Sequence, residues 1–404
     1  MGGQFLRNIQ SRDKLNYDKG FIKNIHYGDI HTKFSTLFDI TKEKVPFINP
    51  NVSVKAIDEI SYCREGDIIF ADASEDVEDV GKSIEVVKLN NEKLLAGLHT
   101  FLARPIDSKL IVGFGGYLFK SDSIRNQIKR ESQGAKVFGI SKNRISNIKI
   151  YYPSNKKEQQ KIASCLFSLD TLITNHSEKL DGLKDYKKWL MQNLFPQLGK
   201  LLPEIRFKEF KNDGDWGEYA LSKITTAVFD GTHQTPIYVE NGVPFFSVEN
   251  IVSGNKNKFI SKKDYELATS KNKPEKGDIL LTRIGKIGFS AIVDWDFDFS
   301  IYVTLACIKP SKKVNADFLH YYFQSDSYQK EIFSKSLLNA VPCKINMNEL
   351  RETKVLLPRN QDEQIKIAHT LSSLDDTISA QAERIKQLQL HKKGLMQQLF
   401  PKIN

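Results

Sequence analysis

Several groups of residues in this chain have types and spacings that could bind a ligand or carry out catalysis. Gly81, Lys82 and Ser83 match the end of a phosphate-binding loop, but Asp76 stands where that motif has its first glycine. The GFGG run that begins at Gly113 lacks the spacing and the strand-to-helix context of a dinucleotide-binding loop, so it predicts a tight turn. Neither motif therefore predicts a nucleotide site.

Metal and acid-base sites have no better support. His26 and His31 have no further metal ligands near them in the sequence, and the cysteines form no close pair that could bind zinc. The acidic stretch 73–82 has the composition of a nuclease site, but a solvated acidic turn is the simpler interpretation. The short motifs of serine hydrolases, zinc proteases and amino-methyltransferases are absent. The sequence thus predicts a protein that is not itself an enzyme and holds no metal.

The elements that must position functional residues belong to a long, basic chain. Its 404 residues exceed what one hydrophobic core usually serves, and 40% are apolar, so we expect two or more domains with cores of their own. A net charge of +10 favours an anionic partner such as nucleic acid or a membrane surface. No signal peptide or membrane-spanning stretch is evident and the four cysteines are scattered, which predicts a cytoplasmic protein with reduced thiols.

One long segment of the chain occurs twice. Residues 158–196 align without a gap with residues 363–401, at a constant shift of 205 positions, and about half of the aligned residues are identical. The similarity extends upstream, where residues 140–153 match residues 345–358. The chain therefore has the pattern of a tandem duplication, in which each copy consists of a variable module followed by the conserved segment.

The repeated segment has the heptad pattern of a long helix. Apolar residues alternate four and three positions apart, which predicts a narrow apolar seam along one face of each copy. Two seams of equal length most simply pair with each other, and a twofold relation between the modules would make the helices antiparallel. At about 1.5 Å per residue, each helix would be a rod of roughly 55 Å. The residues expected to pair the helices are Ile162, Leu166, Leu169, Ile173, Leu180, Leu183, Leu190, Leu194, Ile367, Leu371, Leu374, Ile378, Ile385, Leu388, Leu395 and Leu399.

Polar residues interrupt both seams at matching positions, His176 with Gln381 and Lys187 with Lys392. These side chains could lie at the edge of the seam with their polar ends in water, or they could fix the register of the helix pair. Replacing Gln381 and Lys392 by leucine separates the two interpretations, because a register role predicts a changed oligomeric state or thermal behaviour.

Between the long repeats, short runs rich in β-branched and aromatic residues alternate with Gly, Asp and Pro, which predicts mixed modules. We predict an α+β fold, with two mixed α/β modules joined by two long antiparallel coiled-coil helices in a pseudo-twofold tandem repeat. The predicted boundaries are residues 1–153 for the first module, 154–196 for the first helix, 197–215 for a linker, 216–358 for the second module and 359–404 for the second helix.

The helix entries EQQKIA and EQIKIA, the exits LMQNLFP and LMQQLFP, and the junction that begins PEIRF at Pro203 carry a resemblance. Together they resemble the DNA specificity subunit of a Type I restriction-modification system over nearly the whole chain. In that family the first module usually opens with a lead like Arg206 to Trp216, whereas this chain begins at a position that matches roughly Ser222. We therefore expect the first module to lack an edge element, or to receive it from another part of the assembly.

The resemblance implies a non-catalytic protein with two target recognition domains, each of which reads one half of a bipartite, asymmetric DNA site. It implies two methyltransferase subunits that use S-adenosylmethionine, and restriction and translocase subunits that use ATP and magnesium. Because the helical segment occurs twice, polar outer positions such as Gln159, Lys179 and Arg384 would form two like docking sites. The alternatives are a stand-alone two-headed DNA-binding regulator and a scaffold whose basic charge is incidental.

Residues that read DNA would be polar or basic side chains in loops beside the motifs that resemble the family. Arg283 is the strongest candidate, since the TRIGKIG run places it and Lys286 among glycines that let the backbone approach DNA. We expect Arg283→Ala to cost about 1–3 kcal/mol in specific binding and to relax one half-site only. The candidates are His31, Lys33, His99, Arg104 and Lys136 in the first module, and Thr232, His233, Gln234, Arg283, Lys286 and Lys344 in the second.

Overall fold

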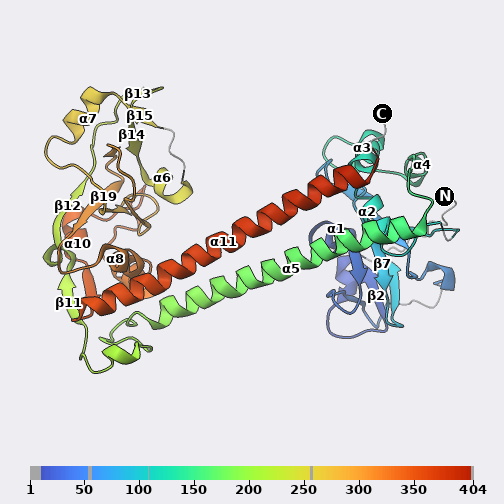
Figure 1. Cartoon of the computed structure of the whole chain (residues 1–404), viewed down its shortest axis with the longest axis horizontal. Coiled ribbons are helices and arrows are strands. Elements are labelled where there is room, and N and C mark those ends of the chain that lie inside the picture. Colours follow the sequence, from blue (N-terminus) through green and yellow to red (C-terminus); the bar gives the residue numbers. More distant parts are fainter. Residues whose placement is uncertain (1–10, 53–56, 108, 255–257, 402–404) are drawn as a thin grey trace. The chain divides into compact units, whose positions relative to one another are not determined.

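The computed structural model describes residues 11–52, 57–107, 109–254 and 258–401, and the chain divides into two compact units (Figure 1). One unit comprises residues 1–177 and 383–404, and the other comprises residues 178–382. Each unit contains one globular module and a part of each of two long helices, α5 (Lys156–Asn193) and α11 (Gln361–Leu399). Neither these helices nor any other in the described ranges has the length and apolar character that a bilayer crossing requires.

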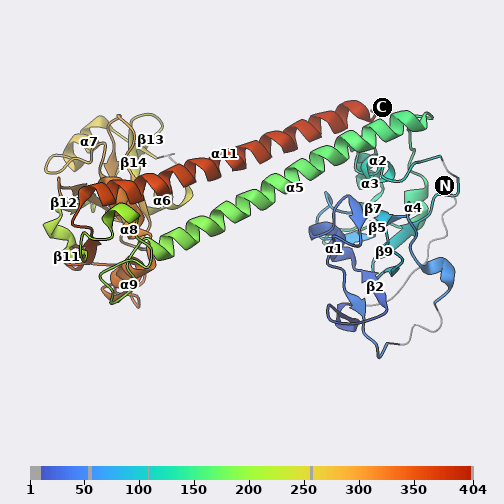
Figure 2. The same ribbon diagram turned by 60° about the horizontal axis from the view of Figure 1, so that its bottom comes forward.

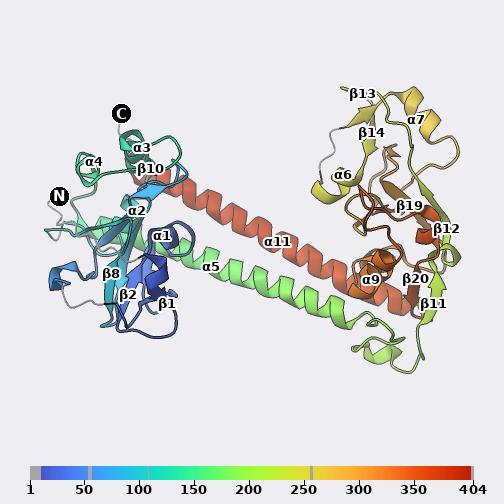
Figure 3. The same ribbon diagram turned by 180° about the vertical axis from the view of Figure 1, so that it is seen from behind.

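The first module is built on two four-stranded sheets. Figures 2 and 3 show this module from two further directions, with β2 and α1 labelled in both. Alternate residues of its central strand β5 face opposite sides, because successive side chains of a strand point to opposite faces. Ile69 lies in a core shared with the second sheet, whereas Phe70 lies in a core shared with helices. The elements are β1 (Leu15–Asn16), β2 (Ile22–Ile25), α1 (Tyr27–Thr32), β3 (Leu37–Asp39), β4 (Phe47–Ile48), β5 (Ile68–Ala71), β6 (Ala73–Ser74), β7 (Ser83–Lys88), β8 (Lys93–Ala96), β9 (Thr100–Ala103), α2 (Gly115–Leu118), α3 (Asp122–Glu131), β10 (Phe138–Gly139) and α4 (Lys142–Ser146).

The second module also has two four-stranded sheets and, in addition, the two-stranded pair β11-β20. Its central strand β16 alternates in the same way, with Leu281 in the core shared with the helices and Leu280 in the core on the other face. The elements are β11 (Gly217–Ala220), β12 (Thr225–Asp230), β13 (Tyr238–Val239), β14 (Val243–Phe246), α6 (Val248–Ser253), β15 (Phe259–Ile260), α7 (Lys262–Ala268), β16 (Ile279–Thr282), β17 (Ser290–Ile292), β18 (Ser300–Ile301), β19 (Leu305–Pro310), α8 (Ala316–Phe323), α9 (Asp326–Ser334), α10 (Met347–Arg351) and β20 (Lys354–Leu357).

The two modules share a three-stranded antiparallel core and differ at its edges. The order β7-β5-β9 in the first module corresponds to β17-β16-β19 in the second. The fourth strand is β3, parallel to β7, in the first module and β12, antiparallel to β19, in the second. At the edge where β11 pairs with β20, the corresponding residues 149–152 of the first module form no strand in the part of the chain that the structure describes.

The structure confirms the predicted fold class of two mixed modules joined by two long antiparallel helices. In the first unit, Ile162 near the start of α5 belongs to the same core as Leu399 at the end of α11. In the second unit, Leu194 just after α5 belongs to the same core as Ile367 near the start of α11. Every predicted seam residue is buried or half-buried. The domain boundaries derived from the sequence stay a prediction.

Both long helices begin with the same polar contacts. Asn155 and Asn360 cap the helices by accepting a hydrogen bond from the backbone N–H two residues later, at 2.9 Å in each case. Gln159 is fully buried, and its side chain bonds to the backbone of Lys109, Ile111 and Pro153. The prediction that Gln159 is an outer docking position was therefore wrong, because this face of the helix lies against the module.

His320 is expected to make the stability of the second unit depend on pH. It is half-buried on α8, and its ring nitrogens lie 2.9 Å from the Ser290 hydroxyl and 2.8 Å from the Gln324 amide nitrogen. Burial, together with Lys187, lowers the pKa of His320 to about 4. The neutral ring therefore stabilises the fold above the unfolded pKa of about 6.5, and this contribution is lost as the pH falls toward 4.

We expect a change from about pH 7.5 to about pH 5.5 to remove about 1 kcal/mol of stability from the second unit through His320. Chemical denaturation of the wild type and of His320→Gln at both pH values measures this contribution. The variant should lose less stability on acidification than the wild type, while His369→Gln, at an exposed position on α11, should behave as the wild type does. Equal pH dependence of all three proteins would contradict the prediction.

Candidate nucleic-acid interface

In both modules, the central strand of the shared core leads into a loop that lies beside a short hairpin. In the first module, β5 is followed by β6, which pairs with β10 so that Ala73 lies opposite Gly139. In the second module, Ile284 after β16 forms a bridge with Lys344. The two modules therefore build the same local arrangement from different sequences, and most of the predicted DNA-binding residues lie there.

Three predicted residues of the first module, His31, His99 and Lys136, lie around this loop. The His31 Nε2 is 3.0 Å from the carbonyl oxygen of Ala73, and the His99 Nδ1 is 3.0 Å from the Asp72 carboxylate. Lys136 is exposed on the hairpin of residues 133–139. The structure thus brings together two imidazoles and a lysine from three separate segments of the chain.

An open pocket of about 690 Å³ lies beside this loop, and His99, Gln133 and Lys142 are among the residues that line it. His99 has a φ of 53°, in the left-handed region that side-chain-bearing residues rarely adopt, and its ring packs edge-on against Tyr27. Imidazole, amide and ammonium groups are those that contact base edges and phosphates. This surface is the candidate DNA interface of the first module.

Lys33 and Arg104 are held by contacts within the module. Lys33 Nζ lies 3.0 Å from the buried Asp29 carboxylate and donates to the Tyr17 hydroxyl at 3.2 Å. Arg104 donates two hydrogen bonds of 2.9 and 2.8 Å to Asp67, which precedes β5, whereas His99 lies beside Asp72 at the far end of that strand. The structure therefore places Arg104 at the opposite end of the core from the other candidates, where it binds an internal carboxylate.

All six predicted residues of the second module lie near the ends of β12 and β16. Thr232, His233 and Gln234 follow β12, and Thr232 forms a bridge with Tyr302 next to β18. Lys286 is exposed in the loop after β16, and Lys344 is half-buried in the hairpin opposite it. The structure thus places all six residues in one region of this module, and their contact with DNA stays a prediction.

Arg283 is the buried centre of that region. Only 7% of its side chain is exposed, and it donates to the Asp230 carboxylate at 3.1 Å and to the backbone carbonyls of Val303 and Ile345 at 2.9 and 3.2 Å. Asp230 also lies 3.0 Å from the His233 Nε2. Arg283 therefore ties the ends of three segments together beneath the loops, and the DNA contact predicted for it stays a prediction.

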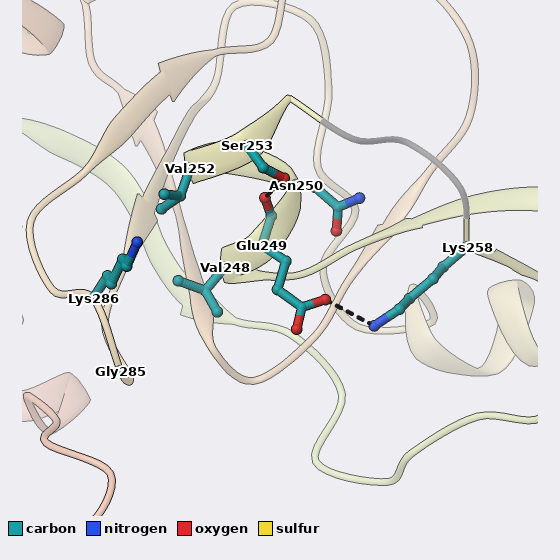
Figure 4. Close-up of a pocket in the computed structure, with 8 residues that line it drawn as sticks. All are labelled: Val248, Glu249, Asn250, Val252, Ser253, Lys258, Gly285 and Lys286. Atoms are coloured by element: carbon teal, nitrogen blue, oxygen red, sulfur yellow. Dashed lines mark hydrogen bonds and ion pairs between the residues drawn. The ribbon is translucent and has the colours of Figure 1, made fainter. Parts of the chain in front are cut away.

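An open pocket of about 500 Å³ lies between α6 and the loop that contains Gly285 and Lys286 (Figure 4). Figure 4 shows Lys286 on one side and Glu249 on the other, and Glu249 forms a 3.2 Å ion pair with Lys258. Val248 and Val252 supply apolar surface in the same pocket. The sequence prediction missed the residues of α6, although the capping box of Ser247 and Asn250 marks the start of that helix.

We expect Lys286→Ala to weaken DNA binding to a similar extent on all sequences and to reduce the salt dependence of binding by about one charge, since an exposed ammonium near DNA contacts phosphate. Titrations of fluorescent duplexes at several salt concentrations measure both effects. Lys312→Ala, which removes an exposed lysine just before α8, is the matched control and should leave binding unchanged. Loss of binding to only one sequence would instead assign Lys286 to base readout.

In the part of these regions that the structure describes, no candidate metal site is found. Among the described residues, no group of three or more His, Cys, Asp or Glu side chains is arranged to hold a metal ion. The carboxylates at the two interfaces are each close to a basic or imidazole group, as Asp72 is to His99 and Asp230 is to Arg283. What the geometry offers is hydrogen bonding and charge, and these are the means by which proteins recognise nucleic acids.

Two mixed modules on antiparallel helices, each with polar loops at the same end of a shared core, define a two-headed binding protein with a duplicated architecture. The family model of the Type I restriction modification DNA specificity domain matches residues 16–185 and 214–390, so the chain belongs to this family. Both modules and large parts of both helices fall within the matched ranges.

Known proteins with similar sequences carry the same description. The Type I restriction enzyme MjaVIII specificity subunit of Methanocaldococcus jannaschii is 26% identical over 307 residues, which is 70% of this chain and 69% of the relative. A protein of that organism described as the Type I restriction enzyme MjaX specificity subunit is 26% identical over 403 residues, which is 97% of this chain and 88% of the relative.

Solved structures show the same fold at low sequence identity. The S subunit of a Type I restriction-modification system from M. genitalium superposes with a TM-score of 0.61 at 15% identity, and the match covers 100% of this chain and 94% of that one. A chain from a structural study of the assembly of the Type I R-M system gives a TM-score of 0.56 at 17% identity, over 99% and 98% of the two chains.

Proposed function

We propose that this chain is a non-catalytic DNA specificity subunit that recognises a bipartite, asymmetric DNA site and directs methyltransferase and restriction subunits to it. The observation that carries the proposal is the duplication of one core with different loops. The same position after the central strand holds Asp72 in the first module and Arg283 in the second. Two modules that have the same core but different loops suit a DNA site whose two halves differ in sequence. Membership of the family favours this function over that of a stand-alone regulator.

The partners that we propose are double-stranded DNA, two methyltransferase subunits, and restriction and translocase subunits. The outer faces of α5 and α11 carry exposed polar residues at matching positions, and two like surfaces on one chain favour two copies of one partner. S-adenosylmethionine, ATP and magnesium would be bound by those partners. The matching exposed pairs are Lys161 with Lys366, Glu178 with Glu383, Lys179 with Arg384, Lys188 with Lys393, and Gln192 with Gln397.

Methylome sequencing of a host with and without this chain tests the proposed function. We expect adenine methylation at one bipartite motif to disappear when the chain is deleted. Exchanging residues 216–358 for the corresponding module of a relative should change one half of the motif and leave the other half intact. Unchanged methylation on deletion would overturn the proposal, and a change in both halves would overturn the assignment of one half-site to each module.

Native mass spectrometry of the complex purified with its methyltransferase tests the proposed stoichiometry. We expect two methyltransferase subunits for each copy of this chain. Charge reversal at Lys179 and Lys188 on α5, or at Arg384 and Lys393 on α11, should each weaken the binding of one methyltransferase subunit. A complex with a single methyltransferase subunit that neither pair of reversals changes would contradict the proposal of two like docking sites.

A further inference from the structure

Each unit contains the same cluster of a lysine, an aspartate and a tyrosine, which we call the clamp. In the second unit, Lys187 Nζ lies 2.6 and 2.8 Å from the two carboxylate oxygens of Asp375, and the Tyr321 hydroxyl donates to Asp375 at 2.8 Å. The Lys187 ammonium also lies 5.5 Å from the centre of the Tyr321 ring. The aspartate thus accepts from both a cation and a phenol.

The first unit repeats this geometry with different residues. The Tyr117 hydroxyl donates to Asp170 at 2.8 Å, Lys392 forms an ion pair with the same carboxylate, and the ammonium lies 5.5 Å from the centre of the Tyr117 ring. The lysines and aspartates of the two clamps stand 205 positions apart in the sequence, as the aligned helices do. The clamp therefore belongs to the repeated pattern of the chain, and both copies contain it.

Each clamp joins three segments of the chain. Its tyrosine lies on a helix of the module, α2 or α8; its aspartate lies on the long helix that leaves that module; and its lysine lies on the long helix that returns to it. Both tyrosines are almost fully buried, with 1% exposure for Tyr117 and 5% for Tyr321. The lysines are two of the four polar residues that interrupt the apolar seams, and each is paired with a carboxylate on the other helix.

On each long helix, a glutamine eleven positions before the clamp aspartate makes a second polar contact with the module. Gln159 and Gln364 are buried, and each side chain bonds to backbone groups of its own module, for example to the N–H of Ile111 at 3.0 Å and of Asn315 at 2.8 Å. Eleven residues of α-helix span about 16 Å, or three turns, so both contacts lie on the same face. Apolar packing is not directional, but two hydrogen-bonded anchors on one face resist both sliding and rolling of a helix on the module.

We propose that the two clamps are positioning elements that hold each module at one angle and height on the helix pair, and thereby fix the spacer length accepted between the two half-sites. This inference rests on the proposed function. Adding one base pair to a spacer moves a half-site by about a tenth of a helical turn along and around the duplex. A module that can roll on its helices would follow such a displacement, whereas a clamped module would not.

Equilibrium binding of DNA duplexes to the full-length chain in its methyltransferase complex tests the proposal. One duplex carries the methylated motif with its natural spacer, and two others carry the same motif with a spacer that is one base pair longer or shorter. We expect the wild type to bind the natural spacer at least about tenfold more tightly than either altered spacer. Asp170→Asn and Asp375→Asn should each reduce this preference about threefold or more while they change binding to the natural spacer less than that. Tyr117→Phe keeps the ring and its packing and should give the same result in the first unit.

Asp376→Asn and Asp185→Asn are the matched controls, since both aspartates are exposed on the long helices, and both should keep the wild-type preference. The charge exchange of Lys187→Asp with Asp375→Lys should recover part of the preference lost in the single variants. Equal loss of binding on all three duplexes, or an unchanged preference in Asp170→Asn, Asp375→Asn and Tyr117→Phe, would overturn the proposal. If the wild type itself bound no bipartite duplex, the proposed function would fail instead.

Discussion

Replacing Arg206 by alanine is expected to lower the free energy of unfolding of the second unit by about 3–5 kcal/mol. Arg206 lies in the segment between α5 and β11, and its Nε and Nη2 donate to the two carboxylate oxygens of Glu363 at 2.8 and 2.7 Å. Only 8% of the Arg206 side chain and 1% of the Glu363 side chain are exposed. The variant leaves a carboxylate buried without its counter-charge, which costs far more than the loss of a surface ion pair.

The duplication supplies the control for this experiment. Glu158 is the residue of the first helix that corresponds to Glu363, but it is exposed. Glu158→Gln should therefore change the unfolding free energy by no more than about 0.5 kcal/mol. Urea denaturation monitored by tryptophan fluorescence suits the measurement, since Trp216 is buried in the core of the second unit. Replacing Arg206 and Glu363 together by methionine should recover much of the stability. An effect of Arg206→Ala as small as that of Glu158→Gln would contradict the prediction.

The long helices could be predicted from the sequence because their signal is local and occurs twice. A seam residue such as Leu166 and its counterpart Leu371 repeat at helical spacing, and both are fully buried. The partners of the polar seam residues could not be predicted, since the pairing of Lys187 with Asp375 joins positions 188 residues apart. Gln159 was misassigned for the same reason: heptad spacing identifies the face that meets the other helix, but it does not show which further face meets the module.

The order of the strands in the sheets could not be predicted from the sequence for a related reason. Runs such as the one that became β16 predict a strand, but pairing is decided by contacts between distant segments, and the fourth strand is added at opposite edges of the two cores. In the second module, Arg283 and Lys286 were chosen because they lie among glycines, and the structure places all six candidates of that module near the ends of β12 and β16. In the first module, Arg104 was chosen as a basic residue beside a motif that resembles the family, but its partner Asp67 lies 37 positions earlier in the chain, just before β5, and could not be predicted.

The second large effect is expected from Arg283→Ala, which should lower the unfolding free energy of the second unit by about 2–4 kcal/mol. The variant leaves two backbone carbonyls without their donor and removes the cation beside Asp230. Those contacts join the end of β12 to the loop after β16 and to the hairpin that contains Lys344. Specific binding should fall as well, and only for the half-site read by the second module, since the loops that Arg283 supports belong to that module alone.

Comparison with Lys286→Ala separates support of the loops from direct contact with DNA. If Arg283 supports the loops without contacting DNA, its alanine variant should lose both stability and half-site specificity. Lys286→Ala should instead weaken DNA binding without a change in stability. Arg283→Lys should restore part of the stability, because an ammonium can still neutralise Asp230 but lacks the planar geometry that reaches three acceptors. Thermal unfolding without DNA, combined with binding to duplexes altered in one half-site, distinguishes these results. A fully stable Arg283→Ala that loses discrimination at a single base pair would show that the guanidinium leaves Asp230 to contact the base directly.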